Sequence, residues 1–236
     1  MPINKSTQQG YLGNIFSGRG IFDMYEQELI FQIPEFIGTS SRNITSNVTS
    51  IDFAVPSGTQ NGDFAVAMLS GGGGANDVDD WANSQGFTFL YENVTAPETN
   101  SAIAYKVLDG TEGANFTFTT TNSCKLSGEI VVYRGSNSII SSSENLDTSG
   151  SASSRTATSI NASRNTILFA FFTADDDNAV FTNVPSDLTL LRTYSNSHKH
   201  NYWIGYKTVI TSGPTGNYTI QFDGTTRNGA GFLFTI

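Results

Sequence analysis

Hydrophobic and polar residues alternate with a period of two along most of the chain from about residue 37. In Phe116-Thr117-Phe118-Thr119 the aromatic rings face one side of an extended strand and the threonines face the other. The segment from Phe64 to Leu69 is apolar at every position, which is typical of a central strand buried on both faces. The pattern predicts strands at 48–55, 63–70, 86–94, 101–108, 115–121 and 126–134, and then at 155–160, 165–173, 187–194, 201–210, 216–222 and 229–236.

Hairpin-type turn signals separate many of these segments. Asn61-Gly62, Asp109-Gly110 and Asp223-Gly224 are residue pairs that favour tight turns between antiparallel strands. Strands of this length and spacing, without a convincing helix among them, predict an all-β fold.

A short pattern occurs twice, 101 residues apart: Ala102-Ile103-Ala104-Tyr105-Lys106 resembles Trp203-Ile204-Gly205-Tyr206-Lys207. Colinear matches extend it on both sides, between 65–69 and 168–172, 88–90 and 189–191, 115–118 and 217–220, and 128–133 and 231–236. The chain is therefore predicted to contain one β unit written twice. In a strand, Ile103 and Tyr105 share a face and Lys106 takes the other, where its ammonium group is expected to reach water. The repeat then marks a duplicated scaffold rather than a duplicated active site.

The repeat sets the expected domain organisation. Copy one covers 37–135, a Ser-rich crossover covers 136–154, and copy two covers 155–236. The crossover retains Ile139, Ile140 and Leu146 and has no proline, so it is predicted to be an ordered strand rather than a flexible linker. We expect a single jelly-roll-like β-sandwich over 37–236, with two sheets face to face and the copies related by a pseudo-twofold axis. Two tandem sandwiches are the alternative.

Residues 1–36 follow a different pattern and are predicted to form an N-terminal arm with one short helix. Asp23 can cap the helix with Glu26 three residues later, and Pro34 ends it. So short a helix is marginal in water and needs a surface to lie on. We expect it to dock on a neighbouring subunit, with covering an open end of the sandwich as the alternative. The candidate docking residues are Tyr11, Leu12, Ile15, Phe16, Ile21, Phe22, Tyr25 and Leu29.

Composition narrows the classes of partner. The chain has 12 Lys and Arg against 21 Asp and Glu, a net charge of −9, which disfavours nucleic acid because phosphate binding relies on clustered basic residues. No apolar run approaches the roughly 20 residues needed to span a bilayer, so no membrane partner is expected. Residues 1–20 lack the apolar core of a signal peptide, which favours folding in a cytosol. The single cysteine, Cys124, excludes an intramolecular disulfide and is interpreted as an inert filler.

Candidate metal sites are weak. Each copy places an acidic loop after the same strand, and the resulting cation candidates are Asp77, Asp79, Asp80, Asp175, Asp176 and Asp177. Neither loop has the spacing of an EF-hand, so solvated turns are the favoured interpretation. His198 and His200 could share a metal, but nearby residues offer no further ligands, and a polar hairpin loop is favoured. We predict no metal and no cofactor.

Catalysis and sugar binding have little support from the residues. The chain contains no Gly-x-Ser-x-Gly elbow and no evident Cys/His pair, so we predict that it is not an enzyme. Four aromatic residues near predicted loops could stack on sugars, although core or subunit contacts are the favoured interpretation. They are Trp81, Tyr91, Tyr194 and Tyr202.

Several segments together resemble β-sandwich virion structural proteins of tailed bacteriophages, notably marine and cyanobacterial phages. They are Gly62-Asp63-Phe64-Ala65-Val66, Gly86-Phe87-Thr88-Phe89, Ala104-Tyr105-Lys106-Val107, Asn115-Phe116-Thr117-Phe118 and Val132-Tyr133-Arg134-Gly135, with Tyr11-Leu12-Gly13-Asn14 and residues 20–27 resembling a leader segment. The chain departs from the resemblance in lacking a Pro-Ser-Gly-Trp turn before residue 86, where Ser84-Gln85-Gly86-Phe87 stands, although copy two retains Pro185-Ser186.

The resemblance implies an architectural role without a catalytic site. It predicts a virion protein assembled in the host cytoplasm, either a capsid decoration protein or a tail-associated adaptor or fibre subunit. Its implied partners are other virion proteins and further copies of itself in a homo-oligomer. The alternative is a module of a phage or bacterial surface assembly that binds host-surface glycans.

Overall fold

The computed structural model describes residues 32–72, 80–92, 99–147, 152–175, 179–195, 200–226 and 228–236. The chain divides between Gln32 and Ile33, and residues 33–236 form the β body described below. Within the described residues the regular structure consists of antiparallel strands, which confirms the predicted all-β class. The helix predicted around Asp23 to Leu29 lies outside the described residues. No described segment forms a helix long and apolar enough to cross a membrane.

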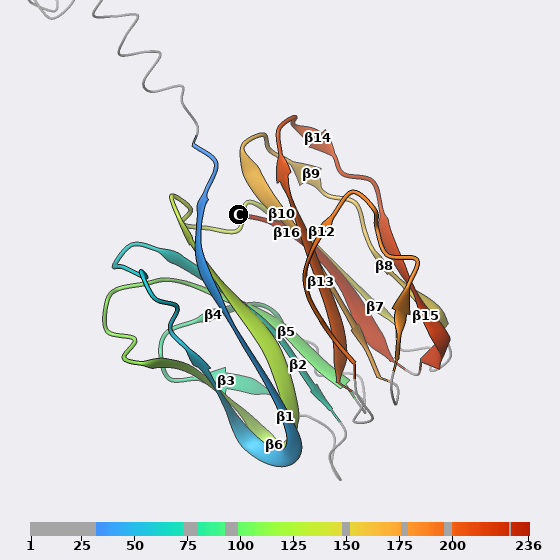
Figure 1. Ribbon diagram of the computed structural model, residues 1–236, viewed down its shortest axis with the longest axis horizontal. Helices are drawn as coiled ribbons and strands as arrows, with labels where there is room; N and C mark the ends of the chain where they lie inside the picture. The colour runs from blue at the N-terminus through green and yellow to red at the C-terminus, as the bar shows by residue number, and fades with distance from the viewer. Residues whose placement is uncertain are drawn as a thin grey trace, which may run out of the picture. The chain divides into compact units, whose positions relative to one another are not determined.

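The first half of the β body, residues 33–135, contains a main sheet with a smaller layer folded against it (Figure 1). Its main sheet has the order β1-β6-β2-β5-β4, and β3 also pairs with β6. The long strands β1 and β6 pair along their lengths with register shifts near residues 44–50, so their distal parts leave the main sheet and join β3. The strands are β1 (Glu35–Ala54), β2 (Phe64–Gly72), β3 (Trp81–Asn83), β4 (Thr88–Glu92), β5 (Thr99–Val107) and β6 (Asn115–Arg134).

The second half, residues 136–236, also has a main sheet, in the order β12-β13-β10-β16-β7. A smaller sheet has the order β11-β15-β8, and β14 pairs with β9. The strands are β7 (Ser141–Asp147), β8 (Ala152–Ala157), β9 (Asn161–Ala162), β10 (Thr166–Ala174), β11 (Phe181–Thr182), β12 (Thr189–Tyr194), β13 (Asn201–Val209), β14 (Gly213–Pro214), β15 (Tyr218–Thr226) and β16 (Gly229–Thr235).

The two halves pair their strands in the same way. The order β4-β5-β2-β6-β1 of the first main sheet has its counterpart in β12-β13-β10-β16-β7 of the second. Ala67 lies opposite Ala104 in the first half, and Ala170 lies opposite Gly205 in the second. The register shift between β4 and β5 follows Phe89, and the one between β12 and β13 follows Leu190. These are positions that the sequence repeat aligns.

Three hydrophobic cores hold the body together. One lies within the first half and includes Phe53 and Phe118; another lies within the second half and includes Phe172 and Ile220. The third lies between the two main sheets and joins residues such as Met68 with residues of the second half. Strands β2 and β10 are therefore buried along their whole length on both faces. Instead of the two face-to-face sheets that we expected, each main sheet is backed by a smaller layer and faces the other main sheet.

Contacts across the third core are reciprocal. Arg192 of β12 lies 3.0 Å from Glu129 of β6, and the ring of Tyr91 in β4 lies 5.8 Å from that of Phe232 in β16. Glu129 lies opposite Met68 of β2, and Phe232 lies opposite Phe171 of β10, so the two occupy corresponding positions. Arg192 and Tyr91 also correspond, because each directly follows the register shift of its edge strand. A contact made in one direction thus has its counterpart in the other, as in a twofold-symmetric interface.

Several strand boundaries differ from those predicted. The predicted strand 48–55 is the last part of β1, so Glu35 and Phe36, assigned to the arm, are its first residues. The predicted strands 115–121 and 126–134 are one strand, β6. The crossover 136–154 contains β7 and the first residues of β8. The first part of β1 is mostly exposed or half-buried, so it carries no hydrophobic alternation that could reveal it. The strand β7 agrees with the expected ordered crossover, but its exposed residues gave no bounds for it.

Candidate functional site

The residues predicted for docking and for cation binding are mostly outside the described part of the chain. This holds for Tyr11, Leu12, Ile15, Phe16, Ile21, Phe22, Tyr25, Leu29, Asp77, Asp79, Asp176 and Asp177. Asp80 is exposed. Asp175 is fully buried and interacts electrostatically with the buried guanidinium group of Arg155, which also lies 2.9 Å from Asp147. Within the described ranges, no three His, Cys, Asp or Glu side chains are grouped so that they could hold a metal ion.

The aromatic and histidine candidates contribute to the hydrophobic cores. Trp81 and Tyr202 are buried, whereas Tyr91 and Tyr194 are half-buried and pack against the core between the main sheets. His200 is fully buried with its ring 5.4 Å from that of Tyr194, and His198 lies outside the described residues. These four aromatic rings therefore do not provide an exposed platform for sugars.

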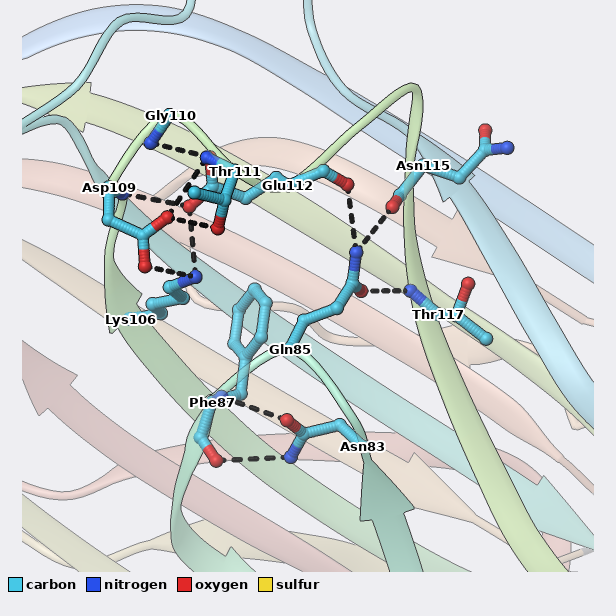
Figure 2. Close-up of polar contacts among 10 residues, drawn as sticks. All are labelled: Asn83, Gln85, Phe87, Lys106, Asp109, Gly110, Thr111, Glu112, Asn115 and Thr117. Carbon is cyan, nitrogen blue, oxygen red and sulfur yellow. Dashed lines mark hydrogen bonds and ion pairs between the residues drawn. The ribbon is translucent and has the colours of Figure 1, made fainter.

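A lysine from the repeated pentapeptide occupies the same strand position in each half, and the first of these, Lys106, is held in an ion-pair network. Its Nζ lies 3.1 Å from Asp109 Oδ2 and 3.0 Å from Glu112 Oε1 (Figure 2). The side chain of Lys106 is only 9% exposed, so its ammonium group is bound by carboxylates rather than reaching water as we expected. Two carboxylates of the loop that joins β5 to β6 therefore bind the ammonium group of Lys106.

The two carboxyl groups of this loop are held in their charged form. Hydrogen bonds from Thr111, followed by the ammonium group of Lys106, lower the pKa of Asp109 to about 2. Burial raises the pKa of Glu112, but the N–H of Asp109, at 2.8 Å, and the ammonium group of Lys106 outweigh it and lower the pKa. A second backbone donor, the N–H of Gly110, lies 3.0 Å from the same carboxylate.

The side chain of Gln85 bridges the loop between β3 and β4 to the start of β6 (Figure 2). Its Nε2 donates to the carbonyl oxygens of Glu112 and Asn115 at 2.9 and 2.8 Å, and its Oε1 accepts from the N–H of Thr117 at 2.7 Å. One amide side chain therefore occupies the space between the loop and the strand. In the same loop, the side chain of Asn83 bonds to both the N–H and the carbonyl oxygen of Phe87.

We expect Gln85→Ala to lower the free energy of unfolding by about 1–2 kcal/mol, because three hydrogen bonds to backbone groups are lost. Urea denaturation of the full-length chain measures the change. The matched control is Ser84→Ala, an exposed neighbour in the same loop, for which a change below about 0.5 kcal/mol is expected. Equal effects of the two substitutions would contradict a bridging role for Gln85.

The second half pairs its lysine differently. Lys207 Nζ lies 2.7 Å from Asp187 Oδ2, in the loop between β11 and β12, and the hydroxyl of Tyr218 donates to the same oxygen at 2.9 Å. Burial raises the pKa of Asp187, but these two donors outweigh it, and the pKa is lowered. Pro214 stands near the place that Glu112 holds in the first half, so no carboxylate is available there. Lys207 instead binds the loop that precedes β12, whereas Lys106 binds the loop that follows β5.

A groove of about 450 Å³ lies beside this loop and is called the second-half groove below. It is lined by residues 183–187 and 217–219 together with Thr215. Asn183 corresponds to Asn83 of the loop that carries Gln85. Asn217 to Thr219 correspond to Asn115 to Thr117, where the backbone of Asn115 and Thr117 bonds to Gln85. The space that Gln85 fills in one half is therefore open in the other.

The polar contacts of Lys106, Gln85 and Lys207 were not predicted from the sequence. The repeated Tyr-Lys pair was visible, but its acidic partners come from different loops in the two halves and share no spacing. Gln85 was noted only as a departure from the resembling turn. The repeated Asn-x-Thr segments, Asn115 to Thr117 and Asn217 to Thr219, were the available signal, since both line the corresponding space.

Comparisons with known proteins do not add to these observations, since no protein-family model, no curated protein and no solved structure matches the chain.

Proposed function

We propose that this chain is a structural component of a tailed-phage virion, assembled in the host cytoplasm, and that it docks through its N-terminal arm while presenting the β body. The role is either capsid decoration or a tail-associated adaptor or fibre subunit. The proposal takes its identity from the resemblance in the sequence, and it involves no catalytic residue. Other virion proteins and further copies of the chain are the proposed partners.

The observation that supports the docking part of the proposal is a pair of exposed apolar side chains at the start of the β body, next to the apolar residues of the arm. The chain divides before Ile33, and Ile33 and Phe36, whose side chains are exposed, lie just after this division. An apolar segment next to exposed apolar residues is suited to a protein partner.

We also infer that the β body arose by duplication of a jelly-roll-like sandwich unit. Equal strand orders, matching registers and the reciprocal contacts of Glu129 and Tyr91 all support duplication. In a virion protein, two fused copies with a shared core give a rigid body. Its central strands are covered, so they cannot pair with another chain, which limits aggregation at high local concentration.

The test of docking is a full-length variant with Ile15→Asp, Phe22→Asp and Leu29→Asp. Carboxylates cannot be buried in an apolar interface without a large cost, so we expect the number of copies per particle to fall by at least about tenfold. Quantitative gel analysis of purified virions, made in cells that supply only the variant, measures the number.

The matched control carries the same added charge at polar arm positions, as Ser6→Asp, Gln9→Asp and Ser17→Asp, and should incorporate normally. Full occupancy by the first variant would exclude docking through the apolar residues of the arm.

A further inference from the structure

The second-half groove presents hydroxyl, amide and carboxylate groups from two directions. Asn183, Ser186 and Asp187 come from the loop before β12, and Asn217 and Thr219 come from β15 or the residue before it. The amide oxygen of Asn217 already accepts from the N–H of Ser159, and the hydroxyl of Thr219 bonds to that of Thr156. Lys207 and Tyr218 both bind Oδ2 of Asp187, so neither of them occupies Oδ1. The side chain of Asp187 is 54% exposed, so its carboxylate is open to solvent in part.

The charge of the groove is balanced. Asp187 is the only charged residue among the lining residues, and the ammonium group of Lys207 neutralises it at 2.7 Å. No lysine or arginine lines the groove to bind a phosphate or a carboxylate. A ligand that fits this surface is uncharged and carries several hydroxyl groups.

Apolar surface is available beside the polar groups. Pro185 and the 41% exposed side chain of Val184 line the groove next to Ser186. The groove has a volume of about 450 Å³ and is broadly open to solvent rather than enclosed. Alternating hydroxyl groups and C–H faces are the distinguishing chemistry of sugars, and both find counterparts here.

The first half shows what this space looks like when it is filled by the protein itself. There the amide group of Gln85 satisfies the backbone groups of Asn115 and Thr117. In the second half the loop carries Pro185 and Ser186 where the first half has Gln85. The loop and β15 are joined instead by the hydrogen bond from the Tyr218 hydroxyl to Asp187, and among the contacts described no lining residue bonds to the backbone of Asn217 or Thr219 as Gln85 does to their counterparts. Because a polar side chain can fill the corresponding space, a ligand with similar donors and acceptors can do so too.

We propose that the second-half groove, between residues 183–187 and 215–219, binds a neutral saccharide through Asp187, Ser186 and the flanking asparagines. The inference goes beyond the virion role and does not depend on it. It places saccharide binding at a site other than the aromatic residues Trp81, Tyr91, Tyr194 and Tyr202.

The test uses the full-length chain and four probes, the methyl glycosides of glucose, galactose, mannose and N-acetylglucosamine. Saturation-transfer NMR, followed by titration, is expected to show binding of at least one of them with a dissociation constant on the order of 1 mM. Ser186→Trp, which places a large ring at an exposed loop position in the groove, and Asp187→Asn, which removes the carboxylate, should each weaken that binding about tenfold or more.

Matched controls come from the first half. Ser84→Trp alters the equivalent loop, and Asp109→Asn removes a carboxylate from the other lysine, so both should leave saccharide binding unchanged. The proposal is overturned if none of the four glycosides binds. It is also overturned if binding survives both groove substitutions, or if the first-half controls reduce it equally. Thermal unfolding of each variant shows that the fold is retained, and incorporation into particles is scored separately, so failure here leaves the docking proposal untouched.

Discussion

Replacing Phe171 by alanine is expected to lower the free energy of unfolding by about 3–5 kcal/mol, the range usual for removing a buried aromatic ring. Phe171 is fully buried in the core between the main sheets, and its ring stacks on that of Phe232 with centroids 5.4 Å apart. The substitution removes apolar surface and leaves a cavity between rigid sheets that cannot close around it. Urea denaturation of the full-length chain measures the loss.

The same experiment tests whether the two halves unfold as one unit. The chain has two tryptophans, Trp81 in the first half and Trp203 in the second, and both are buried. Single-tryptophan versions, made with Trp81→Phe or Trp203→Phe, report each half separately by fluorescence. Because Phe171 lies in the shared core, both reporters should shift to lower urea together.

The control for Phe171 is Ile210→Ala, which removes an apolar side chain that is 76% exposed and should change stability by less than about 0.5 kcal/mol. If Phe171→Ala shifts the Trp203 transition and leaves the Trp81 transition in place, the halves are independent sandwiches and the third core does not couple them.

The strands that sequence reasoning predicted well are those with a buried face. Alternation in Phe116 to Thr119 identified the start of β6, and the apolar run from Phe64 to Leu69 identified β2 as doubly buried. The first part of β1 was missed as a strand, because an edge strand with exposed Ser, Thr and Asn carries no hydrophobic period. The strand β7 was expected only as an ordered crossover strand without defined bounds, for the same reason. The short strand β3 is recognisable only by its pairing with β6.

The polar sites were harder to predict because their partners are distant in sequence. Gln85 bonds to residues 27 to 32 positions away, and Lys207 pairs with Asp187, 20 positions before it. Nothing in the local pattern distinguishes Gln85, which binds the backbone, from an exposed glutamine in a turn. The second half has one more residue in the loop before β12 than the first half has before β4, with Pro185 and Ser186 in the place of Gln85. Sequence alone does not reveal that this change leaves the space beside β15 open.

The two reciprocal clusters across the third core show how matched positions have diverged. On one side the hydroxyl of Thr39 and the guanidinium group of Arg192 bind the carboxylate of Glu129. On the other side Tyr91 packs on Phe232, and its hydroxyl donates to Ser142 at 3.0 Å. One cluster is ionic and the other aromatic, at positions that the strand registers match. An ion pair with a buried carboxylate stands on one side where an aromatic contact stands on the other, and removing the partner of a buried charge is costly.

Breaking the ion pair with Arg192→Met is expected to destabilise the chain by about 2–3 kcal/mol at pH 7, because the carboxylate of Glu129 is left buried without its partner. The expected loss is below that for a fully buried pair, since the side chain of Arg192 is 42% exposed and partly screened by water. Urea denaturation at pH 7 and at about pH 4 measures it.

The loss should depend on pH in a defined direction. Burial raises the pKa of Glu129 above its ordinary value of 4.5, and the bonds from Thr39 and Arg192 only partly oppose this. A carboxyl group with a raised pKa binds its proton more tightly in the folded state, so stability falls as pH rises from 4.5 through the folded-state pKa. Removing Arg192 raises that pKa further. The difference between wild type and variant should therefore be small near pH 4 and largest at neutral pH.

The second cluster suggests the matched rescue. Glu129→Phe together with Arg192→Tyr copies Phe232 and Tyr91, and it should restore most of the stability that Arg192→Met loses at pH 7, without the pH dependence. Glu129→Gln in the Arg192→Met background should recover less, because it removes the charge but leaves a buried amide. A loss from Arg192→Met that is the same at pH 4 and pH 7 would mean that packing of the arginine stem, rather than its charge, stabilises this side of the interface.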